Sequence, residues 1–514
     1  ATSVQAISTQ IRTLARRSVM ARPMSGSRRV ATEPAGADTT PRQSRWSVST
    51  HCERNIPTPI SPIGETLRKH NNVLPCMRSG SDVLHSRVEA LFAAPLLEVA
   101  SAGEYLQQCN SQPETSELTC AATPALVPAT FKDANADLLC VPIDEWRSAR
   151  DWFEALFGFR EQSYAETRRR LKATHDRDGF WSLQGENGVR YKAGQFTTPN
   201  LSELELEAVK LGGMGALPGR VTVRNVKGDV AMFHSQFKNR HATFQVASQF
   251  NCLEFPGPYV TPEDGITSYV CDRTQGPACS VACGPATALR NYFVEAGGES
   301  GQTCDRQVEN LQGILAQLGH AGKHITVRNG YTFAADNGLM VVKGVLQDST
   351  SLQKSCQQEL RVGVHKDVQV TSSGWGLCQQ HDSDQTVTQV FGSACSIAYS
   401  AGNTEMWAAF ARLVLRASFE AALWVGLLSA LRHDGHAGSR RVFLTCLGGG
   451  VFGNPMSWIV EAMQAALEKF AHVNLEIFII TYSGPVPDEL EDLERRFGSG
   501  STGDASRTLG TRRW

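Results

Sequence analysis

Apolar residues recur with two different periods along the second half of the chain. Short apolar or alternating runs are typical of β-strands, and they alternate with longer segments in which apolar residues return every three or four positions, as on one face of a helix. Strands are predicted at 220–226, 242–247, 386–391, 442–444 and 475–480. Helices are predicted at 277–292, 308–318, 407–431 and 456–470. Strands that alternate with helices indicate an α/β protein, with a three-layer α/β/α fold around a mainly parallel or mixed sheet.

The same pattern divides the chain into regions. We expect the α/β domain, with N-terminal additions and insertions, to occupy residues 138–485, followed by a polar tail at 486–514. Residues 63–137 are predicted to form a helical or irregular extension. Residues 1–62 hold six arginines before the first acidic residue, Glu33, and then a Pro-, Ser- and Thr-rich stretch. This composition is typical of an organellar transit peptide or of a disordered tail, and it predicts a mitochondrial location, with plastid and cytoplasm as alternatives.

Composition points to no charged partner. A net charge of −1 and a hydrophobic fraction of 41% give no reason to expect binding to nucleic acid or to an anionic membrane. The longest apolar stretch, 407–431, is interrupted by Arg412, Arg416 and Glu420, which predicts a polar stripe on a buried helix instead of a membrane span. The 14 cysteines lack metal-ligand spacing, so we expect reduced thiols, no metal site and no cofactor. The oligomeric state is left open.

A glycine-rich turn between two predicted strands carries the strongest chemical signal. Gly448, Gly449 and Gly450 follow the strand at 442–444, and the chain continues as Val-Phe-Gly-Asn-Pro into the helix at 456–470. Glycines at the carboxyl end of a strand allow positive φ and let main-chain N–H groups converge on an anion. The positive end of the next helix faces the same point. This turn is therefore predicted to hold a phosphate group.

Three separated segments resemble motifs of the macrodomains, the ADP-ribose-binding α/β/α proteins. Residues 220–229 with Val230 are similar to their opening strand and Gly-Asp-Ile turn, and residues 244–251 to their second strand, which ends in Asn-Ala-Ala-Asn. Residues 447–455 resemble their second phosphate loop, Gly-Val-Phe-Gly-Tyr-Pro. A weaker resemblance links residues 274–279 to the poly(ADP-ribose) glycohydrolase branch. The resemblance implies a macrodomain-like fold that binds ADP-ribose.

The resemblance also implies roles for individual residues. Asp229 matches the aspartate that accepts a hydrogen bond from the adenine amino group, and Asn251 matches the asparagine that contacts the distal ribose. The loop amides would hold the diphosphate. The complete set of expected ligand-binding residues is Asp229, Val230, Asn251, Gln275, Gly449, Gly450, Val451, Phe452, Gly453 and Asn454. Without the resemblance, Asp229 would be interpreted as a turn-former and the glycine loop as a tight structural turn.

Two departures from the family pattern concern the catalytic half of the site. The first phosphate loop of macrodomains is rich in glycine, whereas the matching segment of this chain, 254–265, contains only two glycines. The glycohydrolase branch carries Gln-Glu-Glu where this chain has Gln275, Gly276 and Pro277, so both catalytic glutamates of that branch are missing.

Another carboxylate would therefore be needed for catalysis. Cleavage of a glycosidic bond requires a carboxylate or a bound water at the anomeric carbon. We take Glu254 as the first candidate and Asp264 as the second. The alternative for each is an ordinary loop carboxylate or a helix cap.

These observations favour a protein that binds ADP-ribose or a related nucleotide diphosphate, with hydrolysis of ADP-ribose conjugates as the enzymatic hypothesis. Its partner would be ADP-ribose or an ADP-ribosylated protein. The alternatives are a non-catalytic ADP-ribose reader and a structural subunit with a vestigial pocket. A nicotinamide-dinucleotide site is less favoured, because residues 448–453 fit Gly-x-Gly-x-x-Gly but Glu476 lies within the following strand and not after it.

Overall fold

A computed structural model describes residues 151–376, 378–400, 402–433 and 436–498. The expected transit segment, the extension at 63–137 and most of the polar tail lie outside the described residues. The start of the α/β domain near residue 138 lies outside them too.

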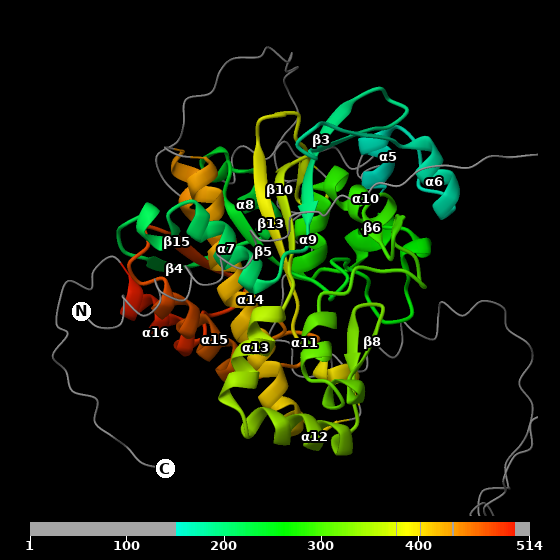
Figure 1. Cartoon of the computed structure of the whole chain (residues 1–514). Helices are drawn as coiled ribbons and strands as arrows, with labels where there is room; N and C mark the ends of the chain where they lie inside the picture. Colours follow the sequence, from blue (N-terminus) through cyan, green and yellow to red (C-terminus); the bar gives the residue numbers. More distant parts are fainter. Residues whose placement is uncertain (1–150, 377, 401, 434–435, 499–514) are drawn as a thin grey trace, which may run out of the picture. The chain divides into compact units, whose positions relative to one another are not determined.

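A nine-stranded mixed sheet forms the centre of the described fold (Figure 1). Its order is β1 (Lys172–His175), β2 (Trp181–Gln184), β3 (Arg190–Thr197), β10 (Gly363–Gln369), β13 (Thr386–Gly392), β5 (Thr243–Ala247), β14 (Arg441–Leu444), β15 (Glu476–Thr481) and β4 (Thr222–Lys227). The strands from β13 to β4 run parallel, whereas β10, β3, β2 and β1 pair antiparallel with their neighbours. The parallel strands alternate with helices along the chain, as the apolar periodicity predicts.

Helices cover both faces of the sheet, and the alternation of side chains along β14 shows the two layers. Val442 and Leu444 belong to the apolar core formed with α7 (Leu201–Lys210), α14 (Thr404–Arg432) and α15 (Met456–Lys469). Phe443, between them, joins the opposite core with α8 (Val230–Ser235), α9 (Gln275–Ala282) and the start of α10 (Gly284–Tyr292). The expected three-layer α/β/α architecture is therefore confirmed.

Further helices and short hairpin strands are present outside the central sheet and the helices named above. They are α5 (Trp152–Phe157), α6 (Tyr164–Arg170), α11 (Gln312–Gln317), α12 (Asp336–Gln347), α13 (Thr350–Glu359) and α16 (Asp488–Phe497), and the short hairpin strands β6 (Glu295–Ala296), β7 (Glu299–Ser300), β8 (Thr326–Arg328), β9 (Tyr331–Phe333), β11 (Ser372–Ser373) and β12 (Cys378–Gln379). Aromatic residues of α5 pack with β2, β3 and α10 in a third apolar cluster.

Helix α14 has the length and apolar composition of a membrane span, but 89% of its apolar window is buried inside the fold. The expected polar stripe is present: Arg412 and Arg416 both form ion pairs with Glu461 of α15, and Glu420 pairs with Lys469. Burial between the sheet and the helices α7, α12, α13 and α15 accounts for the hydrophobicity of this helix.

Two helix predictions were wrong in their extent. The segment 277–292 is two helices that meet at Cys283, because Pro285 has no N–H to continue the first helix. The predicted helix at 308–318 shrinks to α11, since the N–H groups of Val308 and Asn310 bond outward, to Gln302 Oε1 and to the Phe250 carbonyl.

Candidate functional site

The predicted ligand-binding segments meet at one edge of the sheet. Because β4, β5, β14 and β15 are parallel, their carboxyl ends lie on the same side. Asp229 follows β4, Ser248 follows β5, and Thr445 leads from β14 into the glycine loop. A cavity of about 70 Å³ at this edge is lined by Asp229, Val230, Gln275, Trp375 and Thr445, among others.

Asp229 stands at the N-cap of α8. Its Oδ1 accepts a hydrogen bond from the N–H of Ala231 at 2.9 Å, and its Oδ2 accepts one from the indole N–H of Trp375 at 2.7 Å. Burial raises the pKa of this carboxyl, while the two donors oppose the shift. Each carboxylate oxygen has two lone pairs, so Asp229 keeps acceptor capacity for a further donor such as an exocyclic amine.

Trp375 lies beside Asp229 and lines the same small cavity. Its side chain is only 7% exposed, its backbone has a positive φ of 61°, and the Arg273 guanidinium lies 4.9 Å from its ring. Pockets that enclose small molecules hold about 300 Å³ or more. The cavity at Asp229 is thus too small for a nucleotide unless the indole moves. The motif Gly374-Trp375-Gly376 was a sequence signal for this residue, since flanking glycines commonly mark a backbone in unusual conformation.

The glycine loop forms a tight turn between β14 and α15. Gly448 and Gly453 both adopt positive φ, at 77° and 75°. Asn454 closes the loop, because its Nδ2 donates to the carbonyls of Cys395 and Gly448 and its N–H donates to Gly448. Across the described residues, no hydrogen bond is donated by the N–H groups of the three residues at the tip, 450–452. Three residues, 453–455, separate the tip from the 14-residue helix α15, so these free donors come just before its positive end in sequence.

The side chain of Phe452 anchors the glycine loop in an aromatic cluster with Tyr331 and Tyr399. The ring of Phe452 is 8% exposed and lies 5.4 Å from the Tyr331 ring and 5.9 Å from the Tyr399 ring. The Phe452 carbonyl also accepts a hydrogen bond from the N–H of Ala398. The side chain of Phe452 is therefore an anchor, which leaves the backbone of the loop to face solvent with the half-exposed Val451.

Asn251 and Gln275 are held by internal hydrogen bonds. Asn251 is fully buried: its Nδ2 donates to Gln307 at 3.0 Å and to Asn329 at 3.3 Å, and its Oδ1 accepts from Leu253. Gln275 joins the start of α9 to β5, with its Oε1 bonded to the Ala247 N–H and its Nε2 to the Gln245 carbonyl. Asn251 braces the loop beneath the predicted site, whereas Gln275 also lines the small cavity.

Glu254 is buried against the start of α9. Its side chain is 2% exposed, and burial raises its pKa well above the ordinary value, with the Arg290 guanidinium opposing the shift. A Cβ on Gly276 would lie 2.1 Å from Glu254 Oε2, so the carboxyl occupies the space that a side chain at position 276 would need. Glu254 Oε1 has no hydrogen-bond partner. The residue is enclosed, and it does not line the cavity at Asp229.

Asp264 is a cap. Its Oδ2 accepts a hydrogen bond from the N–H of Thr261 at 2.7 Å and closes a capping box around a 3₁₀ turn, Pro262–Asp264. The neighbouring Glu161 accepts bonds from the N–H groups of Ile266 and Thr267 and thereby fixes the next part of the loop. The loop 254–265, expected at the first phosphate position, is thus held by its own Asp264, and the residues that follow it are held by Glu161 from the segment before α6.

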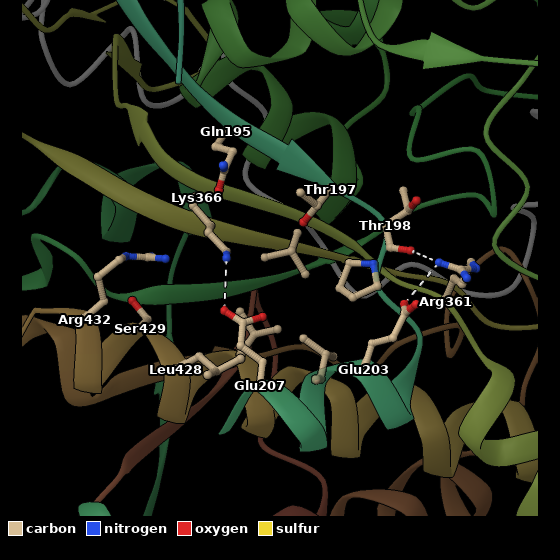
Figure 2. A pocket seen from close by; sticks show the side chains of 14 residues that line it. Gln195, Thr197, Thr198, Glu203, Glu207, Arg361, Lys366, Leu428, Ser429 and Arg432 are labelled. Carbon is tan, nitrogen blue, oxygen red and sulfur yellow. Dashed lines mark hydrogen bonds and ion pairs between the residues drawn. The ribbon is translucent and has the colours of Figure 1, made fainter. Parts of the chain in front are cut away.

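A larger cavity than the one at Asp229 lies elsewhere. It has a volume of about 610 Å³ and separates β3 and β10 from α7 and α14 (Figure 2). Lys366 approaches Glu207 across it at 3.5 Å, and Arg361 approaches Glu203 at 3.3 Å. None of the predicted ligand-binding residues lines this cavity. We therefore take the smaller cavity at Asp229 as the candidate site, because predicted ligand-binding residues line it, although its volume is smaller.

Known proteins resemble this chain in their solved structures, whereas comparisons of sequence find no match. No protein-family model matches the sequence, and no curated protein matches it. Poly(ADP-ribose) glycohydrolase from Thermomonospora curvata, bound to the inhibitor ADP-HPD, is similar over 68% of this chain and 100% of that one, with 14% identity and a TM-score of 0.33. Poly(ADP-ribose) glycohydrolase from Deinococcus radiodurans in complex with ADP-ribose is similar over 66% and 98%, with 12% identity and a TM-score of 0.31. At these TM-scores, the argument for a ligand rests on the residues of this chain.

Proposed function

We propose that this protein binds ADP-ribose, or a related nucleoside diphosphate, at the carboxyl edge of the parallel strands. The diphosphate would lie on the free N–H groups of residues 450–452, and Asp229 would accept a hydrogen bond from the exocyclic amine of the base. The unpaired donors in front of α15, on the same sheet edge as a partly buried carboxylate, are the observation that carries the proposal. Entry of the base would require the Trp375 indole to leave Asp229.

Within this proposal, a non-catalytic reader of ADP-ribose is better supported than a hydrolase. Glu254 is enclosed beside α9, and Asp264 caps a turn at the surface. Neither carboxylate lines the cavity at Asp229. A hydrolase would need Glu254 to reach the anomeric carbon, which requires the loop after β5 to open.

Calorimetry with ADP-ribose, ADP and AMP tests the proposal on the full chain. Gly450→Val is the informative variant, because a Cβ at this position meets no atom within 4 Å yet would crowd a diphosphate at the loop. Gly215→Val is the matched control, since Gly215 is also exposed and also has open space around its Cβ. We expect binding of ADP-ribose by the wild type and the control, and at least tenfold weaker binding by Gly450→Val.

Two outcomes would reject parts of the proposal. No heat with ADP-ribose at millimolar concentration would leave only a structural subunit with a vestigial pocket. Release of ADP-ribose from a modified protein by the wild type, abolished in Glu254→Gln, would replace the reader by a hydrolase.

A further inference from the structure

A second cluster of chemically active side chains lies at the opposite edge of the sheet. His241 precedes β5, Asp367 sits in the irregular part of β10, and His433 caps the end of α14. Their potential ligand atoms all lie within 4.8 Å of one another. Because β5 runs toward the candidate nucleotide site, the cluster at its beginning is a separate feature of the molecule.

We propose that His241, Asp367 and His433 bind a divalent transition-metal ion, Zn²⁺ in the first place. Two imidazoles and one carboxylate form a ligand set that suits zinc, which commonly takes three protein ligands and a water. Imidazole donors argue against Mg²⁺ and Ca²⁺, which prefer oxygen ligands. The three side chains are about one-fifth exposed, so an ion can reach them from solvent.

The distances are close to those of a metal centre. Asp367 Oδ1 lies 2.8 Å from His433 Nε2 and 3.9 Å from His241 Nδ1. Ligand atoms of a tetrahedral zinc ion are roughly 3.4 Å apart, given metal–ligand bonds of about 2.1 Å. The first pair must therefore open and the second must close, each by about half an ångström, and the two histidine nitrogens, which lie within 4.8 Å of each other, must reach the same spacing. Arg432 pairs with the other carboxylate oxygen, Oδ2, at 3.6 Å, which leaves Oδ1 for the metal.

Binding requires one ring to turn. The His241 and His433 rings are stacked, with centroids 3.9 Å apart and planes 12° from parallel. Parallel rings cannot both direct a nitrogen lone pair at one ion, so an imidazole must rotate about its side-chain torsions. The ring of His436 lies edge-on to His241 at 4.8 Å, and its Nδ1 is buried without a partner, so a fourth nitrogen donor is close at hand.

The ion would join three parts of the fold that are far apart in sequence. It would tie the end of α14 to the sheet at the edge where Lys366 and Arg432 begin to line the 610 Å³ cavity. More than sixty residues separate His241 from Asp367, and Asp367 from His433. A search of the sequence for closely spaced metal ligands therefore does not find this combination. The site departs from the expectation that the chain holds no metal.

The test is zinc binding by the full chain. Metal content after dialysis and the thermal midpoint with and without Zn²⁺ are measured for the wild type, Asp367→Asn and His433→Asn. Asn tolerates the positive φ of 53° at position 367, so Asp367→Asn keeps the backbone while removing the charge. We expect at least tenfold weaker zinc binding in both variants, and a zinc-dependent rise of the thermal midpoint in the wild type alone.

A control separates this cluster from ordinary histidine pairs. The rings of His320 and His324 lie 5.5 Å apart, and the variant with both changed to Asn removes that pair only. It should bind zinc as the wild type does. Substitution with Co²⁺ should give a spectrum without thiolate bands, which excludes cysteine ligands. Equal zinc affinity of the wild type and Asp367→Asn, or no binding at 100 µM zinc, overturns the proposal.

Discussion

Gly276 offers the sharpest test of how α9 is packed. A Cβ built on it would lie 2.1 Å from Glu254 Oε2 and 2.2 Å from the carbonyl oxygen of Ala247. Replacing glycine by alanine inside a helix normally stabilises a protein by up to about 1 kcal/mol. Here the new methyl group meets a backbone atom at the end of β5, which cannot rotate away as a side chain can.

For Gly276→Ala, the free energy lost by overpacking should exceed the free energy gained from the higher helix propensity of alanine. Overpacking a tight interior costs typically about 1–3 kcal/mol, and three contacts below 3 Å, two with Glu254 and one with Ala247, place Gly276→Ala at the upper end of that range. We expect Gly276→Ala to lower the free energy of unfolding by about 2 kcal/mol. The double variant Glu254→Ala/Gly276→Ala should recover only part of this loss, because the contact with Ala247 remains.

Urea unfolding followed by circular dichroism measures the change. Gly344→Ala is the matched control, because Gly344 lies inside α12 and a Cβ there meets no atom within 4 Å. It should raise the free energy of unfolding by about 0.5–1 kcal/mol. If Gly276→Ala stabilises the protein as much as the control does, α9 does not rest on Glu254 and β5 as described, and position 276 could hold a larger residue.

Three further predictions concern a buried carboxyl outside the candidate site, the charge of Asp229 and access to it. Burial raises the pKa of the Glu309 carboxyl from 4.5 to about 7, so the folded state binds this proton more tightly than the unfolded state does. Relative to Glu309→Gln, the wild type should therefore lose about 3 kcal/mol of its free energy of unfolding as the pH rises from 4.5 to 7. Urea unfolding of both proteins across that pH range measures the difference. A difference between the two proteins that does not vary with pH would contradict the burial of this carboxyl. Asp229→Asn keeps an oxygen for the Ala231 N–H but turns an amide NH₂, which cannot accept, toward the Trp375 indole N–H, so the free energy of unfolding should fall by about 1–3 kcal/mol and ADP-ribose affinity in calorimetry should fall roughly tenfold; unchanged affinity would remove Asp229 from the site. Trp375→Phe deletes the indole N–H that occupies Asp229 Oδ2 at 2.7 Å, so ADP-ribose should bind more tightly, roughly tenfold by the same assay, and weaker binding would mean that the indole contacts the ligand instead of competing with it.

Local patterns predicted the elements that are regular and self-contained. The strands β4, β5, β13, β14 and β15 and the helices α14 and α15 were all expected within a few residues, because each buries a face whose period is visible in the sequence. The strands β1, β2, β3 and β10 were missed. In β1, β2 and β3, exposed or half-exposed polar residues break up the apolar runs, and in β10 the polar residues His365 and Gln369 are themselves buried, so neither pattern stands out as a strand.

The candidate site was only partly accessible to such reasoning. The glycine loop was expected to bind an anion from its composition; the structure gives it positive φ values at Gly448 and Gly453 and free N–H groups at its tip, and anion binding stays a prediction. Asn251 was expected to contact a ribose, but it is fully buried among Gln307, Asn329 and Leu253. Burial depends on residues far along the chain, so no local pattern could have indicated it.

The amino-acid sequence by itself determined the alternation of strands and helices, and with it the edge of the sheet where loops can carry chemistry. Periodicity and glycine content are local properties, and short-range backbone and side-chain preferences translate them directly into structure. Only the tertiary structure decided that Trp375 covers Asp229, that Glu254 fills the space beside Gly276, and that two distant histidines meet Asp367. These contacts join segments separated by up to about two hundred residues, and they exist because close packing of three layers brings those segments to the same place.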